Sequence, residues 1–346
     1  VLGEHGRGVF ESAPRFEKAG ADWEGLKHEI ETLGEITRRS GRPSTFGLVY
    51  NAVRPDMSDV ALRAVEAENA SGAQLRPQTT CRPIGVVLGI QHRTPWARAG
   101  VTWRSLRDMS VEQRLDTIRN PELRARLIHE GNNPEKVHGN GSAMVDLSRL
   151  YLLDAENPNY RVGQEGTLES LATKAGISPV EYFLNATDES NGSVMLSLPI
   201  LNQDYEAIET MLDHDSIVMG LADAGAHVGQ IMDSSQPTYF LSHWVRDTGY
   251  FTLEEGIRRI TSDTADLFGL KNRGRLVEGA YADINVIDWD KLSLSGPEYV
   301  HDFPGGAGRY IQRGAGYDAT VVNGELFMQN GEHTGALAGV TLRSND

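Results

Sequence analysis

The first two-thirds of the chain alternates between short apolar runs and longer stretches in which apolar residues recur at helical spacing. In the first such stretch, Leu26, Ile30, Leu33 and Ile36 fall on one face of a helix. The strand-like runs cover residues 8–11, 45–50, 75–81, 151–154, 194–198 and 217–221. The helical stretches cover residues 22–38, 58–70, 110–130, 166–191 and 205–212, and Ser110 with Gln113 forms a capping-box pattern at the start of the third.

This alternation of strands and helices predicts an α/β fold with a parallel sheet, open or closed, because parallel strands need crossover helices between them. A closed barrel of eight strands would need about two more strands upstream of those that the pattern provides.

The pattern changes after residue 223. Helices are predicted near 238–248 and 253–268, and β-rich segments follow at 282–287 and 319–327 with turn residues between them. We interpret these segments as a small separate β module. Residues 296–316 contain many Gly and Pro residues and are predicted to form a long loop.

Composition narrows the classes of function. The chain has 346 residues and a formal net charge of −15, which argues against a nucleic-acid partner because phosphate binding needs clustered Lys and Arg. No apolar run approaches the roughly 20 residues that span a bilayer, so we expect a soluble protein with no membrane partner. The single cysteine, Cys81, rules out an internal disulfide and favours a reducing, cytoplasmic location.

The strongest candidate for chemistry lies in residues 217–228 (Ile-Val-Met-Gly-Leu-Ala-Asp-Ala-Gly-Ala-His-Val). An apolar strand runs into Asp223, and the small residues around it leave room for a ligand. At the mouth of a barrel such an aspartate can bind a metal ion or accept a proton from a metal-bound water, and His227 could join it. The alternative is that Asp223 caps the next helix or turn.

Other candidate residues are weaker. His92 follows an apolar run and could contact a substrate, although a surface-loop histidine is the simpler reading. Cys81 ends a strand pattern and could be a ligand or nucleophile, but buried cysteines are usually inert packing residues. Glu11 could face the same mouth or be solvated, and His243 lies in an amphipathic helix where a structural role is expected. The run at 305–308 has no Lys-Ser/Thr after it and is not a P-loop.

The C-terminal third resembles a known family in an ordered series of segments. These are residues 220–227 (Gly-Leu-Ala-Asp-Ala-Gly-Ala-His), 253–261 (Leu-Glu-Glu-Gly-Ile-Arg-Arg-Ile-Thr), 267–276, 279–288, 322–325 and 331–336 (Gly-Glu-His-Thr-Gly-Ala). Together they resemble the amidohydrolase superfamily, and specifically its N-acyl-D-amino-acid deacylase (D-aminoacylase-like) branch. Asn272 stands where the family signature has an Asp.

The resemblance implies a (β/α)8 TIM-like barrel, partial here because its first strands are missing, with a small C-terminal β-sandwich module. The expected domains are 1–275 for the barrel and 276–346 for the sandwich part. The implied function is metal-dependent hydrolysis of C–N bonds, by deacylation of N-acyl (D-)amino acids. Asp223 matches the family's general base and metal partner, His227 and His92 are candidates for substrate contact, and Arg82 or Arg93 could hold a substrate carboxylate.

The family's His-x-His metal pair does not occur in these residues. We therefore expect zinc ligands largely outside this chain, and either a missing N-terminal segment or a homo-oligomer covering the incomplete side of the barrel. The partner expected besides these is a small-molecule N-acylated substrate. The alternatives are another C–N hydrolase of the superfamily, such as a cyclic amidase or deaminase, and a catalytically inert module of the same fold.

Overall fold

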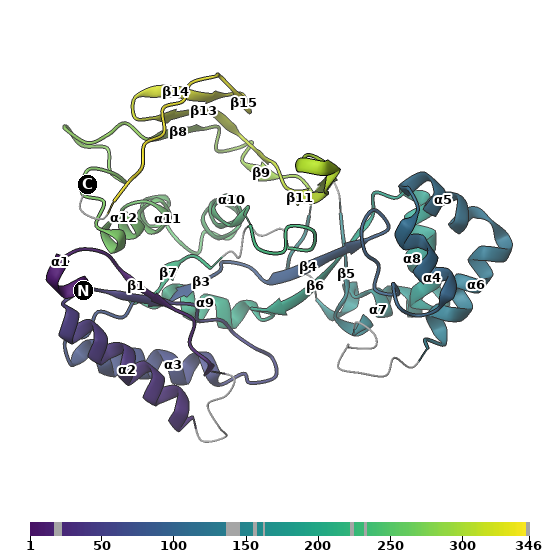
Figure 1. Ribbon diagram of the computed structural model, residues 1–346, viewed down its shortest axis with the longest axis horizontal. Helices are drawn as coiled ribbons and strands as arrows, with labels where there is room; N and C mark the ends of the chain where they lie inside the picture. The colour runs from purple at the N-terminus through teal and green to yellow at the C-terminus, as the bar shows by residue number, and fades with distance from the viewer. Residues whose placement is uncertain are drawn as a thin grey trace.

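The computed structural model describes residues 1–16, 23–135, 146–154, 158–161, 163–221, 225–231 and 234–343. Figure 1 shows an elongated molecule in which strands connect a body that contains both chain ends to a lobe of helices at the far side. The C-terminal β-sheet lies over the helices that follow β7 (Val218–Met219).

Four short strands of the body pair in parallel. They are β1 (Phe10–Ser12), β2 (Ser44–Phe46), β3 (Gln78–Thr79) and β7, in the spatial order β1-β2-β3-β7. The crossovers run through α2 (Glu24–Ser40) and α3 (Met57–Ala70), and α9 (Tyr205–Asp213) precedes β7. The predicted parallel sheet is confirmed for these strands, and their carboxyl ends share one side.

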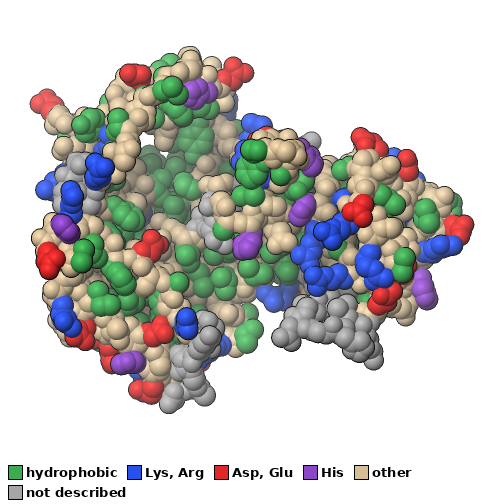
Figure 2. All heavy atoms as spheres, viewed as in Figure 1, with side chains coloured by type: hydrophobic (Ala, Val, Ile, Leu, Met, Phe, Trp, Pro, Cys, Tyr) green, Lys and Arg blue, Asp and Glu red, His purple; other side chains and the backbone are tan. Residues whose placement is uncertain are grey.

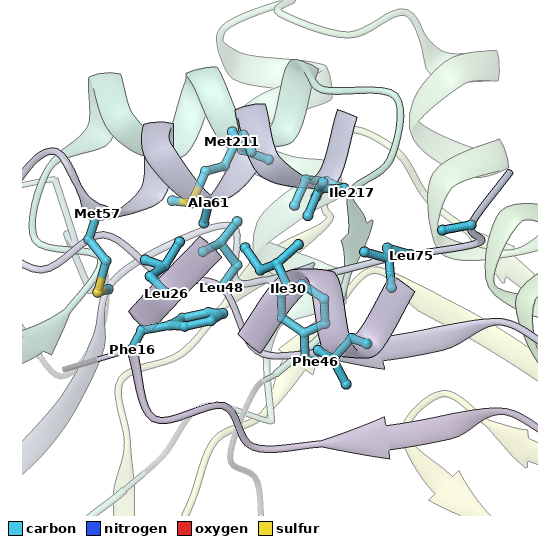
Figure 3. Close-up of a cluster of buried hydrophobic side chains, with 14 residues drawn as sticks. Phe16, Leu26, Ile30, Phe46, Leu48, Met57, Ala61, Leu75, Met211 and Ile217 are labelled. Carbon is cyan, nitrogen blue, oxygen red and sulfur yellow. The ribbon is translucent and has the colours of Figure 1, made fainter. Parts of the chain in front are cut away.

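The core of the body lies between these strands and helices. The apolar stripe of α2 is buried through Leu26, Ile30 and Leu33, as its spacing predicts. Figure 3 shows Leu26 and Ile30 packed among Phe46, Leu48 and Leu75 of the strand region, with Met211 of α9 on the other side. These side chains fix the strands relative to their covering helices.

A second sheet extends away from the body and is antiparallel. It consists of β4 (Ile84–Gly89), β6 (Met195–Leu201) and β5 (Tyr151–Leu153), in the order β4-β6-β5. The prediction that residues 151–154 and 194–198 belong to the parallel sheet was therefore wrong. The helices between β4 and β5 and those between β5 and β6 together build a lobe of their own, so they do not return the chain as parallel crossovers.

The lobe is a bundle of helices around aromatic side chains. Trp96 stacks on Trp103 with ring centroids 5.5 Å apart and lies 5.3 Å from Phe183. The predicted capping box of Ser110 and Gln113 is present, and the stretch 110–130 divides at Pro121. The helices are α4 (Val101–Ser105), α5 (Val111–Arg119), α6 (Pro121–Asn132), α7 (Leu168–Ala175) and α8 (Pro179–Glu189).

The predicted C-terminal β-rich segments form an antiparallel sheet of order β15-β14-β13-β8. Its central hairpin turns at Asn323 and Gly324, both with positive φ, which is the sequence and geometry that a tight hairpin turn favours. The strands are β8 (Ile284–Ile287), β13 (Tyr317–Val322), β14 (Glu325–Gln329) and β15 (Glu332–His333). Before them come α10 (Gln236–Tyr239), a π-helical segment (Phe240–Asp247), α11 (Leu253–Ile260) and α12 (Ser262–Phe268).

The prediction of a long loop at 296–316 was wrong. This segment contains β10 (Glu298–Val300) and β11 (Arg309–Ile311), which form an antiparallel pair, and β12 (Gly314–Ala315), which pairs with β9 (Ser293–Leu294). Tyr299 and Tyr310 are cross-strand partners with ring centroids 4.9 Å apart, and this contact outweighs the turn-forming residues around it.

Among the described helices, none combines the length and apolar character that crossing a membrane requires.

We predict that Ile30→Ala lowers the free energy of unfolding by about 2–5 kcal/mol, because it removes a fully buried side chain from a packed core. The measurement is urea unfolding followed by circular dichroism. Glu31→Ala on the exposed face of α2 is the control and should change the same quantity by less than about 0.5 kcal/mol. Equal losses in the two variants would contradict the assignment of this face to the core.

Candidate functional site

The candidate site lies at the carboxyl ends of the parallel strands. The chain continues from β3 into Thr80, Cys81 and Arg82, and from β7 through Gly220 and Leu221 towards Asp223. Asp223 itself falls at 222–224, outside the described residues, so its predicted role stays a prediction. The part of the site that the structure describes consists of the segments at the carboxyl ends of β2, β3 and β7.

Asn202 ties these strand ends together. Its side chain is completely buried, and its Oδ1 accepts a hydrogen bond from the Tyr50 N–H at 2.7 Å. Its Nδ2 donates to the Thr80 Oγ1 at 2.8 Å and the Thr79 Oγ1 at 3.2 Å. The backbone of Asn202 is left-handed, with φ of 54°, a conformation that asparagine tolerates better than most residues. One carboxamide therefore joins the segments after β2, β3 and β6.

Cys81 is a packing residue. Its side chain is completely buried, and its thiol donates to the Gln236 Oε1 at 2.9 Å. Its carbonyl oxygen accepts from the Trp244 Nε1 at 2.6 Å. A thiol enclosed in this way has no access to substrate, so the structure supports the inert reading of Cys81 rather than a nucleophile or ligand.

Arg82 is also buried, with 2% of its surface exposed. One guanidinium nitrogen donates to the Ser235 Oγ at 3.0 Å and another to the Pro83 carbonyl at 3.2 Å. The guanidinium carbon lies 4.0 Å from the centroid of the Tyr160 ring, a cation–π contact. The predicted role of Arg82 in holding a substrate carboxylate stays a prediction.

An aromatic cluster adjoins Arg82. The hydroxyl groups of Tyr205 and Tyr239 share a hydrogen bond of 2.8 Å, and the Tyr239 ring stacks on His243 with centroids 4.9 Å apart. Burial is the main cause that raises the pKa of both phenols, so both remain neutral. Burial also lowers the pKa of His243, and Arg161 lowers it further.

A cavity of about 500 Å³ opens beside this cluster. Its size falls in the range of small-molecule sites. Tyr205 and Arg161 both line it, and Asn202 comes directly before the lining segment that starts at Gln203. The lining residues are Pro83, Tyr151, Asn159, Tyr160, Arg161, Gly163, Ser197, Pro199, Gln203, Asp204, Tyr205 and Glu206.

The two predicted site histidines lie in a different place. His92 follows β4, and a Cβ built on Gly229 would lie 3.4 Å from its ring, so His92 touches the segment that contains His227. The His227 side chain is exposed, and its carbonyl accepts hydrogen bonds from the backbone of Gln230 and Ile231. The structure thus brings His92 to the segment after Asp223, whereas Arg82 is held among Tyr160 and Ser235.

Glu11 lies within β1 and is exposed, with its Oε1 accepting a hydrogen bond of 3.3 Å from the Gln78 side chain. Within the described ranges no three His, Cys, Asp or Glu side chains are grouped so that they could hold a metal ion. The described strand ends offer Tyr50, Asn51 and a thiol already bonded to Gln236. These residues do not fit a zinc site, which normally has at least three protein ligands.

Sequence reasoning did not identify Asn202, Arg161, Tyr205 or Tyr239. The nearest signal is the polar run Asn-Gln-Asp at 202–204 directly after an apolar strand, in which Asp204 also caps α9. That signal is typical of a helix start and carries no indication of a buried network.

Comparison with known proteins places this geometry in context. A sequence model of the amidohydrolase family matches residues 2–327. A D-aminoacylase of Alcaligenes xylosoxydans xylosoxydans is 36% identical over 102 residues, which are 30% of this chain and 19% of that protein. An N-acyl-D-glutamate deacylase of the same organism is 42% identical over 55 residues, 16% of this chain and 11% of that protein.

Solved structures of D-aminoacylase share the fold. One, determined in work on the functional role of its binuclear metal centre, superposes with a TM-score of 0.53 at 21% identity, covering 99% of this chain and 57% of that one. Another D-aminoacylase crystal structure gives a TM-score of 0.52 at 19% identity, with the same coverage. The chain thus spans little more than half the length of these structures. Because the family match extends over nearly the whole sequence, this chain belongs to the amidohydrolase family.

Proposed function

We propose that this chain is part of an enzyme that hydrolyses a C–N bond, by deacylation of an N-acylated amino acid of the D series. The observation that carries the proposal is the likeness to D-aminoacylase along 99% of the chain, together with the family match. The nearby curated relatives, one acting on N-acyl-D-glutamate, support the choice of substrate class.

The finer architecture belongs to the same proposal. The strip β1-β2-β3-β7 with α2, α3 and α9 would be the later part of a (β/α)8 barrel within residues 1–275. The sheet around β13 would belong to a β-sandwich within residues 276–346. In a barrel of this kind the active site is built from the loops after the strands, which is where the segment leading to Asp223 lies. Asn202 follows β6 and bonds to the ends of β2 and β3 from there.

Asp223 is the proposed acid–base group. Its carboxylate would accept a proton from the attacking water and then deliver that proton to the nitrogen of the leaving amine. In the sequence its neighbours Ala222, Ala224 and Gly225 are small, and such side chains would leave space for a planar amide. A bound divalent metal, zinc by the family resemblance, would supply a water of lowered pKa. The described residues do not form a ligand set for such a metal ion. The proton transfers proposed for Asp223 do not depend on which residues bind the metal.

Arg161 is better placed than Arg82 to hold the carboxylate of the substrate. Arg161 lines the cavity of about 500 Å³, whereas Arg82 is buried and donates to Ser235 and Pro83. The Arg161 guanidinium lies 5.1 Å from the Tyr205 ring centroid and 4.0 Å from the Glu209 carboxylate, contacts that orient it without enclosing it. Arginine binds carboxylates with two parallel hydrogen bonds.

The test of the function is hydrolysis of a panel of N-acyl-D- and N-acyl-L-amino acids by the full-length protein. We predict that Asp223→Asn lowers kcat by about 10²–10⁴-fold, the contribution typical of a general acid–base group. Asp116→Asn on the exposed surface of α5 is the control and should leave kcat unchanged. Undiminished turnover by Asp223→Asn would end the proposal, and no turnover of the panel by the wild type would favour an inert module.

We predict that Arg161→Gln raises KM about tenfold or more while kcat changes little, because it removes a charged hydrogen bond to the bound substrate. Steady-state kinetics with the best N-acyl amino acid gives both constants. Arg63→Gln, an exposed arginine of α3, is the control. An unchanged KM would remove Arg161 from the site.

We predict that Asn202→Ala lowers the free energy of unfolding by about 1–3 kcal/mol, because the Tyr50 N–H and the Thr80 hydroxyl lose a buried partner. Unfolding in urea measures this loss. Asn133→Ala at the exposed end of α6 should cost far less. Stability equal to the wild type in Asn202→Ala would show that the network does not hold the strand ends.

A further inference from the structure

The antiparallel sheet β4-β6-β5 forms an arm between the body and the helical lobe. A second cavity, of about 650 Å³, lies where this arm meets the lobe, away from the aromatic cluster. Figure 2 shows Lys and Arg side chains gathered in this part of the molecule. Among the described residues that line the cavity, five are arginines and only Asp108 is acidic. The arginines are Arg93, Arg98, Arg104, Arg107 and Arg114.

Most of this positive charge is not compensated. Arg104 pairs with Glu135 at 2.8 Å, and Asp108 can balance one further arginine. Three guanidinium charges therefore remain in a chain whose formal net charge is −15. Arg93, Arg98 and Arg107 are exposed and form no ion pair within the part of the chain that the structure describes. An anion bound between these arginines would be attracted by all three charges at once.

Arg114 organises the cavity from beneath. Its guanidinium group donates to the carbonyl oxygens of Ile90 at 2.6 Å, His92 at 3.2 Å and Arg107 at 3.1 Å. Because these carbonyls belong to the loop after β4 and to the turn Leu106–Asp108, one side chain fixes both walls that carry the free arginines. The backbone that carries Arg93 and Arg107 is therefore anchored before any ligand arrives, which lowers the cost of binding.

His92 lines the same cavity and ties it to the β10–β11 hairpin. Its Nδ1 is buried without a hydrogen-bond partner among the described residues, and its ring packs against Tyr299 with centroids 4.9 Å apart. The ring therefore belongs to the wall of the cavity and is held there by the β10–β11 pair. The buried floor of Ile90, Trp103 and Leu106 gives the cavity an apolar base.

We propose that this arginine-lined cavity binds a small oxyanion of two or more negative charges, a phosphate ester or a polycarboxylate. Guanidinium groups bind both with paired hydrogen bonds. The volume fits a small molecule, and the strongly negative chain would repel a polymeric anion. This site is separate from the proposed hydrolytic function, and its test requires no turnover.

The test is isothermal titration calorimetry of the full-length protein with pyrophosphate and, in a second arm, with citrate, both at constant ionic strength. We expect saturable binding of one or both, and the arm that binds more tightly identifies the phosphate or the carboxylate source. The double variant Arg93→Ala/Arg107→Ala should bind at least about tenfold more weakly, because it removes two charged donors.

The control is Arg119→Ala/Arg126→Ala, which removes the same charge from the lobe at two ion-paired residues outside the cavity. It should bind like the wild type, and thermal melting checks that both variants fold. The proposal is overturned if neither anion binds saturably, if the cavity variant keeps full affinity, or if the control loses as much affinity as the cavity variant.

Discussion

The buried carboxamide of Asn202 is the interaction on which the strand-end site depends. Parallel strands end with backbone groups and hydroxyls that have no partner in the next strand, and these groups cannot be buried without hydrogen bonds. Asn202 supplies one acceptor to Tyr50 and donors to Thr79 and Thr80. It comes from the end of β6, which belongs to the antiparallel sheet, so the same residue joins the arm to the body. The site and the attachment of the lobe therefore share one hydrogen-bond network.

The sequence predicts local structure well where one face of an element is buried. The stripe of α2, the capping box at Ser110 and the strands β1, β2, β3 and β7 all follow from spacing and turn residues. The sequence does not predict which strand another strand pairs with, or in which direction. The strands β5 and β6, for example, have the same apolar pattern that a parallel strand would have. Their antiparallel pairing depends on how α7 and α8, the helices between them, pack into the lobe, and no local sequence pattern describes that packing. The same holds for β10 and β11. The glycines of this segment predict a loop, but the cross-strand contact between Tyr299 and Tyr310 stabilises a strand pair there.

Some of the candidate site residues can be recognised from the sequence, and others only from the fold. Asp223 stands out in the sequence because an apolar strand leads into it and small residues surround it. Asn202 and Arg161 do not stand out in this way. The role of Asn202 depends on Tyr50, which lies more than 100 residues away in the sequence. The role of Arg161 depends on a cavity that forms only when distant segments pack together. The arginines of the second cavity are scattered over 93–114 and show no motif, and only the fold of the loop and helices brings them together.

The segment 225–231, which follows Asp223 in the chain, also borders the arginine-lined cavity. Its Gln230 carbonyl accepts the Val87 N–H of β4 at 2.7 Å, and its Val228 carbonyl accepts the Tyr310 N–H of β11 at 2.8 Å. The segment is thus held between the arm and the β10–β11 hairpin, and His92 of the arginine-lined cavity packs on the same hairpin through Tyr299. Gln230 itself lines that cavity. Because one short stretch of backbone carries the residues next to Asp223 and a wall of the anion site, a displacement of the arm would alter both places together.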